Sequence, residues 1–345
     1  MYPSYVTDPD ALDLAFQDII KALNDDSAGF LFGAGMSAAS GVPTGNQLLQ
    51  SLLRLRFPDT GVDPPDDDIL RRLVQEFPFE VSVEAIANRL GRYREQLTEE
   101  LKRILLEPNF KPSTAHEDFA AVCFWGGRPR LDRVFTTNFD LLLEAVLGES
   151  RAVPITESNA KEISKVVGKS KIPILHLHGV LDGIYQITET ELYNDDYKAL
   201  NSEFRTALGY KNAFVLVGYS MNDPDFRNIY LSYRREIIAR RVGDKKTYVV
   251  SPARDGYSYR LGSDVWKVRG ADWIPLDAAT FFARLKYLLE HRFDKETRDS
   301  VKSKFNLGDE KALEDLIARV ADALRVDPAD ALEFLKESRT KGGGQ

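Results

Sequence analysis

Short apolar runs bounded by turn residues recur along the chain at wide intervals, and helical patterns separate them. Each run is four to six residues long and apolar on both faces, which is typical of strands buried between two layers of helices. Helices between such strands imply right-handed β-α-β crossovers. The sequence therefore predicts an α/β fold with a doubly wound parallel sheet. The five clearest runs are residues 29–32, 131–135, 172–177, 213–217 and 247–250, and residues 273–276 are a candidate sixth.

A segment of about a hundred residues between the first two runs departs from this alternation. Its pattern is mostly helical, and it is too long for a single crossover. We therefore interpret about residues 46–125 as an inserted helical subdomain. The helices predicted within it are 46–57, 69–77, 82–93 and 96–106.

The chain becomes rich in charged residues after Arg292. Residues 310–326 and 328–337 are predicted to form a pair of amphipathic helices, and a flexible tail is expected after them. This divides the chain into a main domain at residues 1–292 and a C-terminal helical extension at residues 293–345.

Composition limits the partners that such a chain can bind. Lys and Arg number 46 against 53 Asp and Glu, a net charge of −7, which argues against an extended surface for nucleic acid. Cys123 is the only cysteine, so the chain can form neither an intrachain disulfide nor a cysteine-based zinc site. No signal peptide begins the sequence, and no run reaches the roughly 18 apolar residues of a membrane span. We expect a cytoplasmic protein without a membrane or metal partner.

The first polar motif directly follows the first strand. Residues 32–43 read Phe-Gly-Ala-Gly-Met-Ser-Ala-Ala-Ser-Gly-Val-Pro. Small residues here allow the backbone to approach a pyrophosphate closely while its N–H groups donate to the oxygens. A tight strand-to-helix turn is the alternative explanation. Hydride transfer is disfavoured, because residues 40–43 interrupt the helix of a dehydrogenase fingerprint and no strand with an acidic end follows about twenty residues later.

The second motif, Thr136-Thr137-Asn138-Phe139-Asp140, follows the second strand. Ligands of doubly wound sheets bind at the carboxyl ends of the strands, so these side chains are candidates for a binding site. Their alternative role is to cap the helix predicted at 141–147, with Asn138 or Asp140 as the N-cap residue.

The third motif, Ile-Leu-His-Leu-His-Gly at residues 174–179, holds two of the four histidines. Strand alternation places His176 and His178 on the same side of the strand. We interpret His176 as a hydrogen-bonded core residue. His178 ends the strand and precedes Gly179, so it can face a cleft.

The fourth motif is Gly218-Tyr219-Ser220, at the end of the fourth strand. Gly218 would let a nucleotide lie close to the strand, and the Ser220 hydroxyl could bind a phosphate or a ribose. Asp223 and Pro224 follow, in the pattern of an N-cap and a first helical residue.

In this order at successive strand ends, the four motifs resemble those of the sirtuin fold. The resemblance is closer to the sirtuin-like NAD-hydrolysing proteins of bacterial antiphage defence systems such as Thoeris. It covers about residues 28–276. It implies a Rossmann-like, sirtuin-type catalytic domain with NAD as its substrate.

The same resemblance implies roles for individual residues. Asn138 would hold the nicotinamide ribose or the attacking water, and His178 would be the general base, which makes these two the expected catalytic residues. Asp140 would bind the nicotinamide carboxamide. The residues expected to bind NAD are Gly33, Ala34, Gly35, Ser37, Thr137, Asp140, Gly218 and Ser220.

Departures from the deacylating sirtuins favour water, rather than an acyl-lysine, as the acceptor when NAD is cleaved. Those enzymes carry a zinc module of paired cysteines, which one cysteine cannot build, and their Asp-Phe-Arg is replaced here by Thr44-Gly45-Asn46. We expect an NAD+ glycohydrolase that depletes NAD in antiphage defence. A sensor or scaffold that binds NAD or ADP-ribose without cleaving it is the alternative, and a protein deacylase is the third hypothesis.

An NADase that was always active would kill its cell, so control of the activity is expected. We expect a homo-oligomer and a regulatory partner, such as a hexameric ATPase or another component of a defence system. The inserted helices and the helix pair after Arg292 are candidate assembly surfaces, and packing onto their own domain is the alternative.

Overall fold

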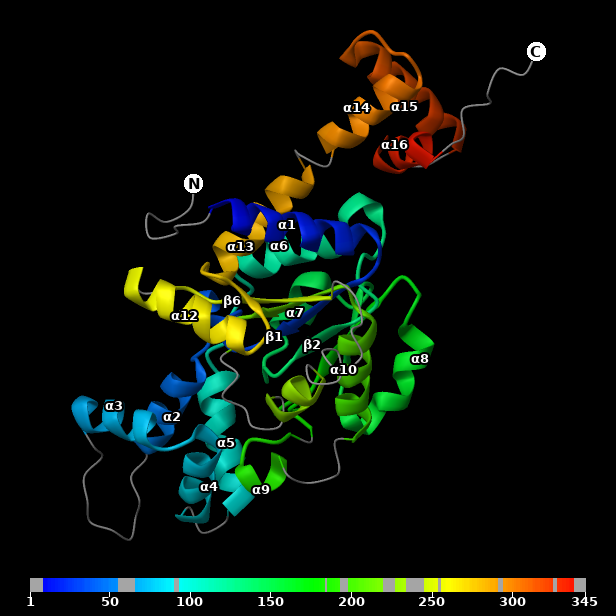
Figure 1. Ribbon diagram of the computed structural model, residues 1–345. Coiled ribbons are helices and arrows are strands. Elements are labelled where there is room, and N and C mark those ends of the chain that lie inside the picture. Colours follow the sequence, from blue (N-terminus) through cyan, green and yellow to red (C-terminus); the bar gives the residue numbers. More distant parts are fainter. Residues whose placement is uncertain are drawn as a thin grey trace.

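The computed structural model describes residues 9–54, 66–89, 93–183, 185–192, 198–219, 227–233, 245–253, 256–290, 294–324 and 328–337. Within these ranges, seven strands form one sheet in the order β3-β4-β2-β1-β5-β6-β7, and every neighbouring pair is parallel (Figure 1). The strands are β1 (Ala28–Phe32), β2 (Val134–Thr136), β3 (Ala152–Ile155), β4 (Ile172–His176), β5 (Ala213–Val217), β6 (Lys246–Val250) and β7 (Asp272–Ile274). Ser220, Asp223, Pro224 and the predicted tail lie outside the described residues.

The neighbouring strands β1 and β5 are buried on both faces, as their continuous apolar runs predict. Alternate side chains enter two separate cores. Phe30 and Phe32 of β1 point into one core, whereas Leu31 points into the other. Both cores are covered by helices, and this arrangement confirms the predicted doubly wound α/β fold.

The first core lies between the sheet and α1 (Pro9–Asn24), α6 (Thr114–Cys123), α7 (Leu142–Leu147) and α13 (Ala278–Leu288). Its centre is a cluster of four aromatic rings whose centroids lie 4.7–6.1 Å apart, formed by Phe30, Phe32, Phe119 and Phe282. The opposite face is covered by α8 (Ile163–Val166), α10 (Lys198–Tyr210) and α12 (Gly256–Val268). Figure 1 shows these two helical layers on either side of the strands.

The edge strand β3 (Ala152–Ile155) was not predicted from the sequence. It is short, it contains Pro154, and only its first and last residues are buried. Proline cannot donate to a strand ladder and is found at sheet edges, which is where β3 lies. The candidate strand at 273–276 is confirmed as β7 (Asp272–Ile274), the opposite edge of the sheet.

Four helices between β1 and β2 share a third core of their own. They are α2 (Gly45–Leu53), α3 (Asp67–Glu76), α4 (Phe79–Arg89) and α5 (Tyr93–Leu105). The short helix α9 (Glu189–Leu192) joins them, because the Thr190 amide and hydroxyl both donate to Glu84 of α4. Helix α6 also falls within the span 46–125, yet its buried residues belong to the first core, beneath α13. The domain boundaries themselves stay a prediction.

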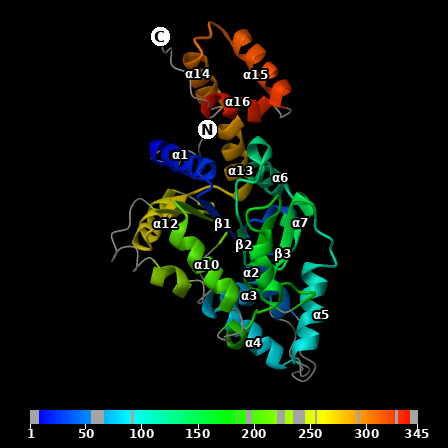
Figure 2. The same cartoon turned by 90° about the vertical axis from the view of Figure 1, so that its right-hand side faces the viewer.

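The C-terminal helices are α14 (Asp294–Lys304), α15 (Glu310–Leu324) and α16 (Pro328–Glu337). They share a small fourth core that includes Val301, Leu313 and Leu332. Helix α14 was not predicted, because Val301 is the only strongly apolar residue in it. In both views these helices lie at the opposite end of the molecule from α2–α5 (Figure 2), and α16 contacts the short helix η2 (Trp125–Gly127). Among the described residues, no helix combines the length and apolarity needed to cross a membrane.

His116 is a fully buried histidine in the first turn of α6. The Ser113 amide donates to its Nδ1 over 3.2 Å, so the ring completes a capping box with Ser113. Burial lowers the pKa of His116 to about 4. The folded protein therefore keeps this ring neutral at pH values where an unfolded chain would protonate it.

We predict that this histidine weakens the fold in acid. As the pH falls from about 7 to about 4, the unfolded state gains a proton that the folded state does not bind, which removes up to about 3 kcal/mol of stability. A His116→Gln variant keeps an acceptor for the Ser113 amide but does not titrate. Chemical denaturation at the two pH values should show a smaller loss for the variant than for the wild type. Equal losses of stability in the variant and the wild type would contradict the assignment of this acid sensitivity to His116.

Candidate functional site

A cavity of about 630 Å³ lies at the carboxyl ends of the central strands. This volume falls within the range of about 300–1,000 Å³ that is usual for cofactor and small-molecule sites. The neighbours of β1 are β2 and β5, so the chain order reverses here, and such reversals are where doubly wound sheets bind ligands. The cavity brings together eight of the ten residues expected at the site: Gly33, Ala34, Gly35, Thr137, Asn138, Asp140, His178 and Gly218.

Two glycine turns form the base of this cavity, one after β1 and one after β5. A Cβ atom built on Gly35 would lie 2.6 Å from the Gly218 Cα, and one built on Gly33 would lie 2.7 Å from the Gly218 carbonyl oxygen. Gly218 itself has a φ of 62°, which other residues rarely adopt. These glycines are therefore required first for the contact between the turns.

The amide groups of the same turn are partly used within the protein. The Gly33 N–H donates to the Val217 carbonyl and the Gly35 N–H to the Gly218 carbonyl, both over 3.0 Å. From the sequence, such amides are predicted to donate to phosphate oxygens. These two cannot do so while they hold the turns together, so a phosphate here would need other donors.

Asn138 is held by three neighbouring segments. Its N–H donates to the Thr136 hydroxyl over 3.0 Å, and its side-chain amide donates to the Ser37 hydroxyl over 3.2 Å. Its carbonyl oxygen lies 3.1 Å from the Nδ1 atom of His176. Asn138 is only 9% exposed, and the exposed part faces the cavity. Its side chain is therefore held in one orientation.

Ser37 supports the site from behind Asn138. It is 1% exposed and is not among the cavity-lining residues. Its hydroxyl accepts the hydrogen bond from Asn138 and interacts with the Asp140 carboxylate. Ser37 therefore links these two side chains, and direct contact with NAD stays a prediction.

Asp140 combines a local structural role with a place in the cavity. Its carboxylate accepts from the Leu142 N–H over 3.2 Å, which orders the chain just before α7. Burial raises the pKa of this carboxyl group, although hydrogen bonds from Leu142 and Ser37 and the charge of His176 oppose the shift. The predicted N-cap role of Asn138 or Asp140 is wrong, because the N-cap residue of α7 is Leu141; Asp140 precedes it and lines the cavity.

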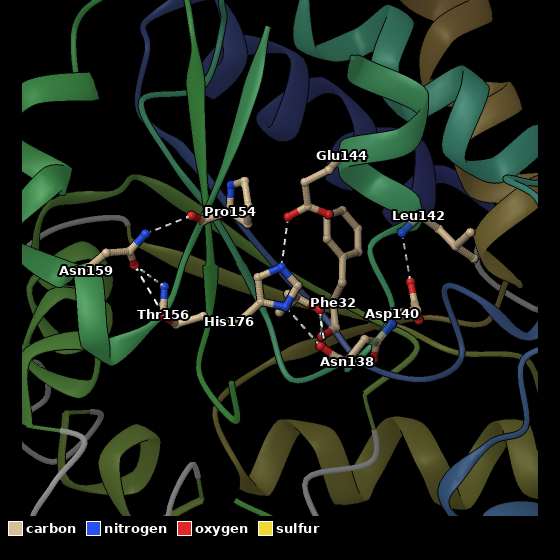
Figure 3. Close-up of polar contacts among 10 residues, drawn as sticks. Phe32, Asn138, Asp140, Leu142, Glu144, Pro154, Thr156, Asn159 and His176 are labelled. Carbon is tan, nitrogen blue, oxygen red and sulfur yellow. Dashed lines mark hydrogen bonds and ion pairs between the residues drawn. The ribbon is translucent and has the colours of Figure 1, made fainter. Parts of the chain in front are cut away.

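The two histidines of the third motif have different surroundings. His176 is fully buried, and its Nε2 lies 2.8 Å from a carboxylate oxygen of Glu144, so it has partners on both ring nitrogens, as expected of a core residue (Figure 3). His178 is half-buried and lines the cavity. Its ring centroid lies 6.4 Å from that of Phe139. Gly179, with a φ of 75°, then turns the chain away from the site.

Residues outside the four sequence motifs complete the cavity. Ser251 and Asp277 follow β6 and β7, so their positions at strand ends could have revealed them. Glu80 and Trp266 lie within α4 and α12, where no local pattern marks them as site residues. The wall formed by the inserted segment and its helices consists of Val42, Pro43, Thr44, Gly45, Asn46, Leu48, Phe79, Glu80 and Leu105.

The expectation that the chain has no zinc site stays a prediction. Within the described ranges, no three or more His, Cys, Asp or Glu side chains are grouped so as to hold a metal ion. Cys123 is buried in the first core, and burial raises the pKa of its thiol well above the usual range. This thiol is therefore neutral and contributes to packing.

Part of the chain is similar to known proteins. Residues 132–274 match the model of a family described as SIR2-like domain. The chain is 24% identical over 223 residues to the NAD(+) hydrolase ThsA of Cytobacillus dafuensis, which covers 63% of this chain and 40% of that protein. It is also 24% identical over 226 residues to the NAD(+) hydrolase ThsA of Bacillus cereus (strain MSX-D12), with 62% and 41% covered. The alignments thus span about two fifths of the length of these relatives.

The contact between the glycine turns can be tested with two matched substitutions. In Gly218→Ala the new methyl group would lie 2.5 Å from the backbone of Gly35 and Met36, so the turns must separate. Gly168 has a similar φ of 77° but nothing within 4 Å of a Cβ atom, so Gly168→Ala introduces backbone strain without a clash. We predict that Gly218→Ala is the more destabilising by at least about 1–3 kcal/mol. Equal melting temperatures for the two variants would contradict this packing.

Proposed function

Because the chain carries a SIR2-like domain and is homologous to two NAD(+) hydrolases, we propose that it is an NAD+ glycohydrolase. It would cleave the nicotinamide–ribose bond and release nicotinamide and ADP-ribose. One observation carries the proposal for this chain. Asn138 and His178 follow two neighbouring strands, β2 and β4, and both line the same cavity as the glycine turns.

The departure of nicotinamide requires little catalytic assistance. Nicotinamide in NAD is a cationic pyridinium, so it leaves with the bonding electron pair as a neutral molecule. The ribose C1′ becomes oxocarbenium-like, as in other glycosyl transfers. A water oxygen then forms the new bond to C1′ and gives up one proton. The site must therefore hold the ribose and deliver one oriented water molecule.

His178 is the proposed general base for that proton. An imidazole with a pKa near 6.5 accepts a proton readily at neutral pH. Asn138 is the proposed positioning group for the ribose or the water, because its side chain is held in one orientation at the cavity. Asp140, buried beside it, is the proposed partner of the nicotinamide carboxamide.

The inserted helices supply the wall that faces the strand ends. Leu48, Phe79 and Leu105 give this wall an apolar surface. A dinucleotide bound between the wall and the glycine turns would be shielded from bulk water, which limits attack to the oriented molecule. Ala34 and Gly218 are the proposed contacts for the phosphate and adenosine parts of NAD.

The proposal extends to a role in antiphage defence, as an enzyme that depletes NAD when activated. Its support is the homology to the NAD(+) hydrolases ThsA. Such an activity must be restrained until it is needed. A homo-oligomer and a regulatory partner would supply this control, and the separate core of the C-terminal helices makes them a candidate surface for such contacts.

We predict that the purified protein releases nicotinamide from NAD and that His178→Ala lowers kcat by about 10²–10⁴-fold. NAD binding should change little, because the imidazole is one contact among many in the cavity. Chromatography of the products and calorimetric titration with NAD measure the two properties. His116→Gln, a change of a buried histidine that does not line the cavity, is the control.

The outcomes separate the competing functions. Unchanged turnover in His178→Ala would refute its role as the base. Binding of NAD by the wild type without release of nicotinamide would favour the sensor or scaffold. Turnover that appears only with an acetyl-lysine peptide would favour the deacylase.

A further inference from the structure

The buried histidine of β4 lies between two hydrogen-bond acceptors. Its Nδ1 lies 3.1 Å from the carbonyl oxygen of Asn138, and its Nε2 lies 2.8 Å from an oxygen of Glu144 (Figure 3). A carbonyl oxygen can only accept, and an ionised carboxylate can only accept. A neutral imidazole has a single N–H and cannot satisfy both. With Glu144 ionised, the two contacts therefore require an imidazolium at His176.

The electrostatic surroundings agree with this assignment. Burial disfavours the charged form of His176, but the hydrogen bond and charge of Glu144, the Asn138 carbonyl and the charge of Asp140 outweigh it and raise its pKa. These groups come from α7 and from the loop after β2. The His176 side chain is 1% exposed and that of Glu144 is 13% exposed, so water screens the pair weakly.

We propose that the buried pair of His176 and Glu144 is a positioning device that holds Asn138 in its reactive orientation. The proposal rests on the proposed function, since it assigns two further residues to the same site. Neither residue lines the cavity, so neither touches the substrate. They act through the main chain of Asn138.

The position of the contact explains how it would act. The N–H of Asn138 is bound by Thr136, its side-chain amide nitrogen by Ser37, and its carbonyl oxygen by His176. Among the described residues, no group donates to its side-chain oxygen, which is the atom left for the substrate or the water. Loss of the His176 contact would free the peptide that follows Asn138 to rotate and would move this oxygen.

The charge balance also suits the reaction. An imidazolium alone beneath the cavity would oppose the positive charge that develops on the ribose. Glu144 neutralises it, so the loop is anchored without adding net positive charge. The pair contributes little to the stability of the fold, because the second oxygen of Glu144 is buried without a hydrogen-bond partner among the described residues.

Two substitutions of His176 distinguish a role in positioning Asn138 from a purely structural role. The amide nitrogen of an asparagine side chain overlies Nδ1 of histidine, whereas that of glutamine overlies Nε2. His176→Asn therefore keeps a donor for the Asn138 carbonyl and loses Glu144, and His176→Gln does the reverse. His176→Asn leaves the Glu144 carboxylate without its partner, whereas His176→Gln leaves only a backbone carbonyl, so His176→Asn should be the more destabilising of the two. A lower kcat in His176→Gln therefore cannot result from lower stability.

The expected result is a difference in kcat. His176→Gln should lower kcat for NAD by about 100-fold with little change in KM, because the reacting group is displaced by about an ångström. His176→Asn should retain a clearly higher kcat. His116→Gln, the same chemical change outside the site, should leave kcat unchanged. Equal losses in His176→Asn and His176→Gln would overturn the proposal.

A readout without turnover keeps this test separate from the proposed function. Nitrogen NMR of the histidine-labelled wild type should show protons on both ring nitrogens of His176 at a pH just above the ordinary imidazole pKa of about 6.5, and the Glu144→Gln variant should lose one of them. A singly protonated His176 in the wild type would overturn the ion pair even if NAD is cleaved. Absence of nicotinamide release with a doubly protonated His176 would instead refute the proposed function and leave the pair intact.

Discussion

The contact between the two glycine turns determines where every other part of the site can lie. Parallel strands bring the carboxyl ends of β1 and β5 together, and Gly35 and Gly218 allow their turns to meet backbone to backbone. The space above this contact becomes the base of the cavity. The motifs after β2 and β4 enter the same space, because these strands are the next in the sheet on one side.

Buried polar groups then determine which atoms face the cavity. His176 and His178 are two residues apart on one strand end, yet the first is enclosed between Glu144 and Asn138 while the second lines the cavity. One histidine therefore contacts the loop after β2, and the other lies at the cavity. Ser37 works in the same way, since it joins Asn138 and Asp140 from behind. The site thus consists of a few cavity-lining side chains and the buried residues that hold them in place.

The sequence predicted the parts of this structure that local patterns encode. Continuous apolar runs revealed five strands and the doubly wound fold, and polar residues at strand ends located the cavity. The strand around Pro154 was missed because it is a short edge strand with no continuous apolar run. Glu80 and Trp266 were missed because their places in the cavity depend on how α4 and α12 pack. The sequence also could not show that the amides of Gly33 and Gly35 are used within the protein.

The central claim is that Asn138 and His178 converge on the anomeric carbon of a bound dinucleotide. A crystal structure of the His178→Ala variant soaked with NAD tests it most directly. The account predicts the nicotinamide ribose beside Asn138, with C1′ facing the space that the imidazole vacates and the phosphates near the glycine turns. A dinucleotide bound in the reverse direction, or in a different part of the molecule, would contradict it.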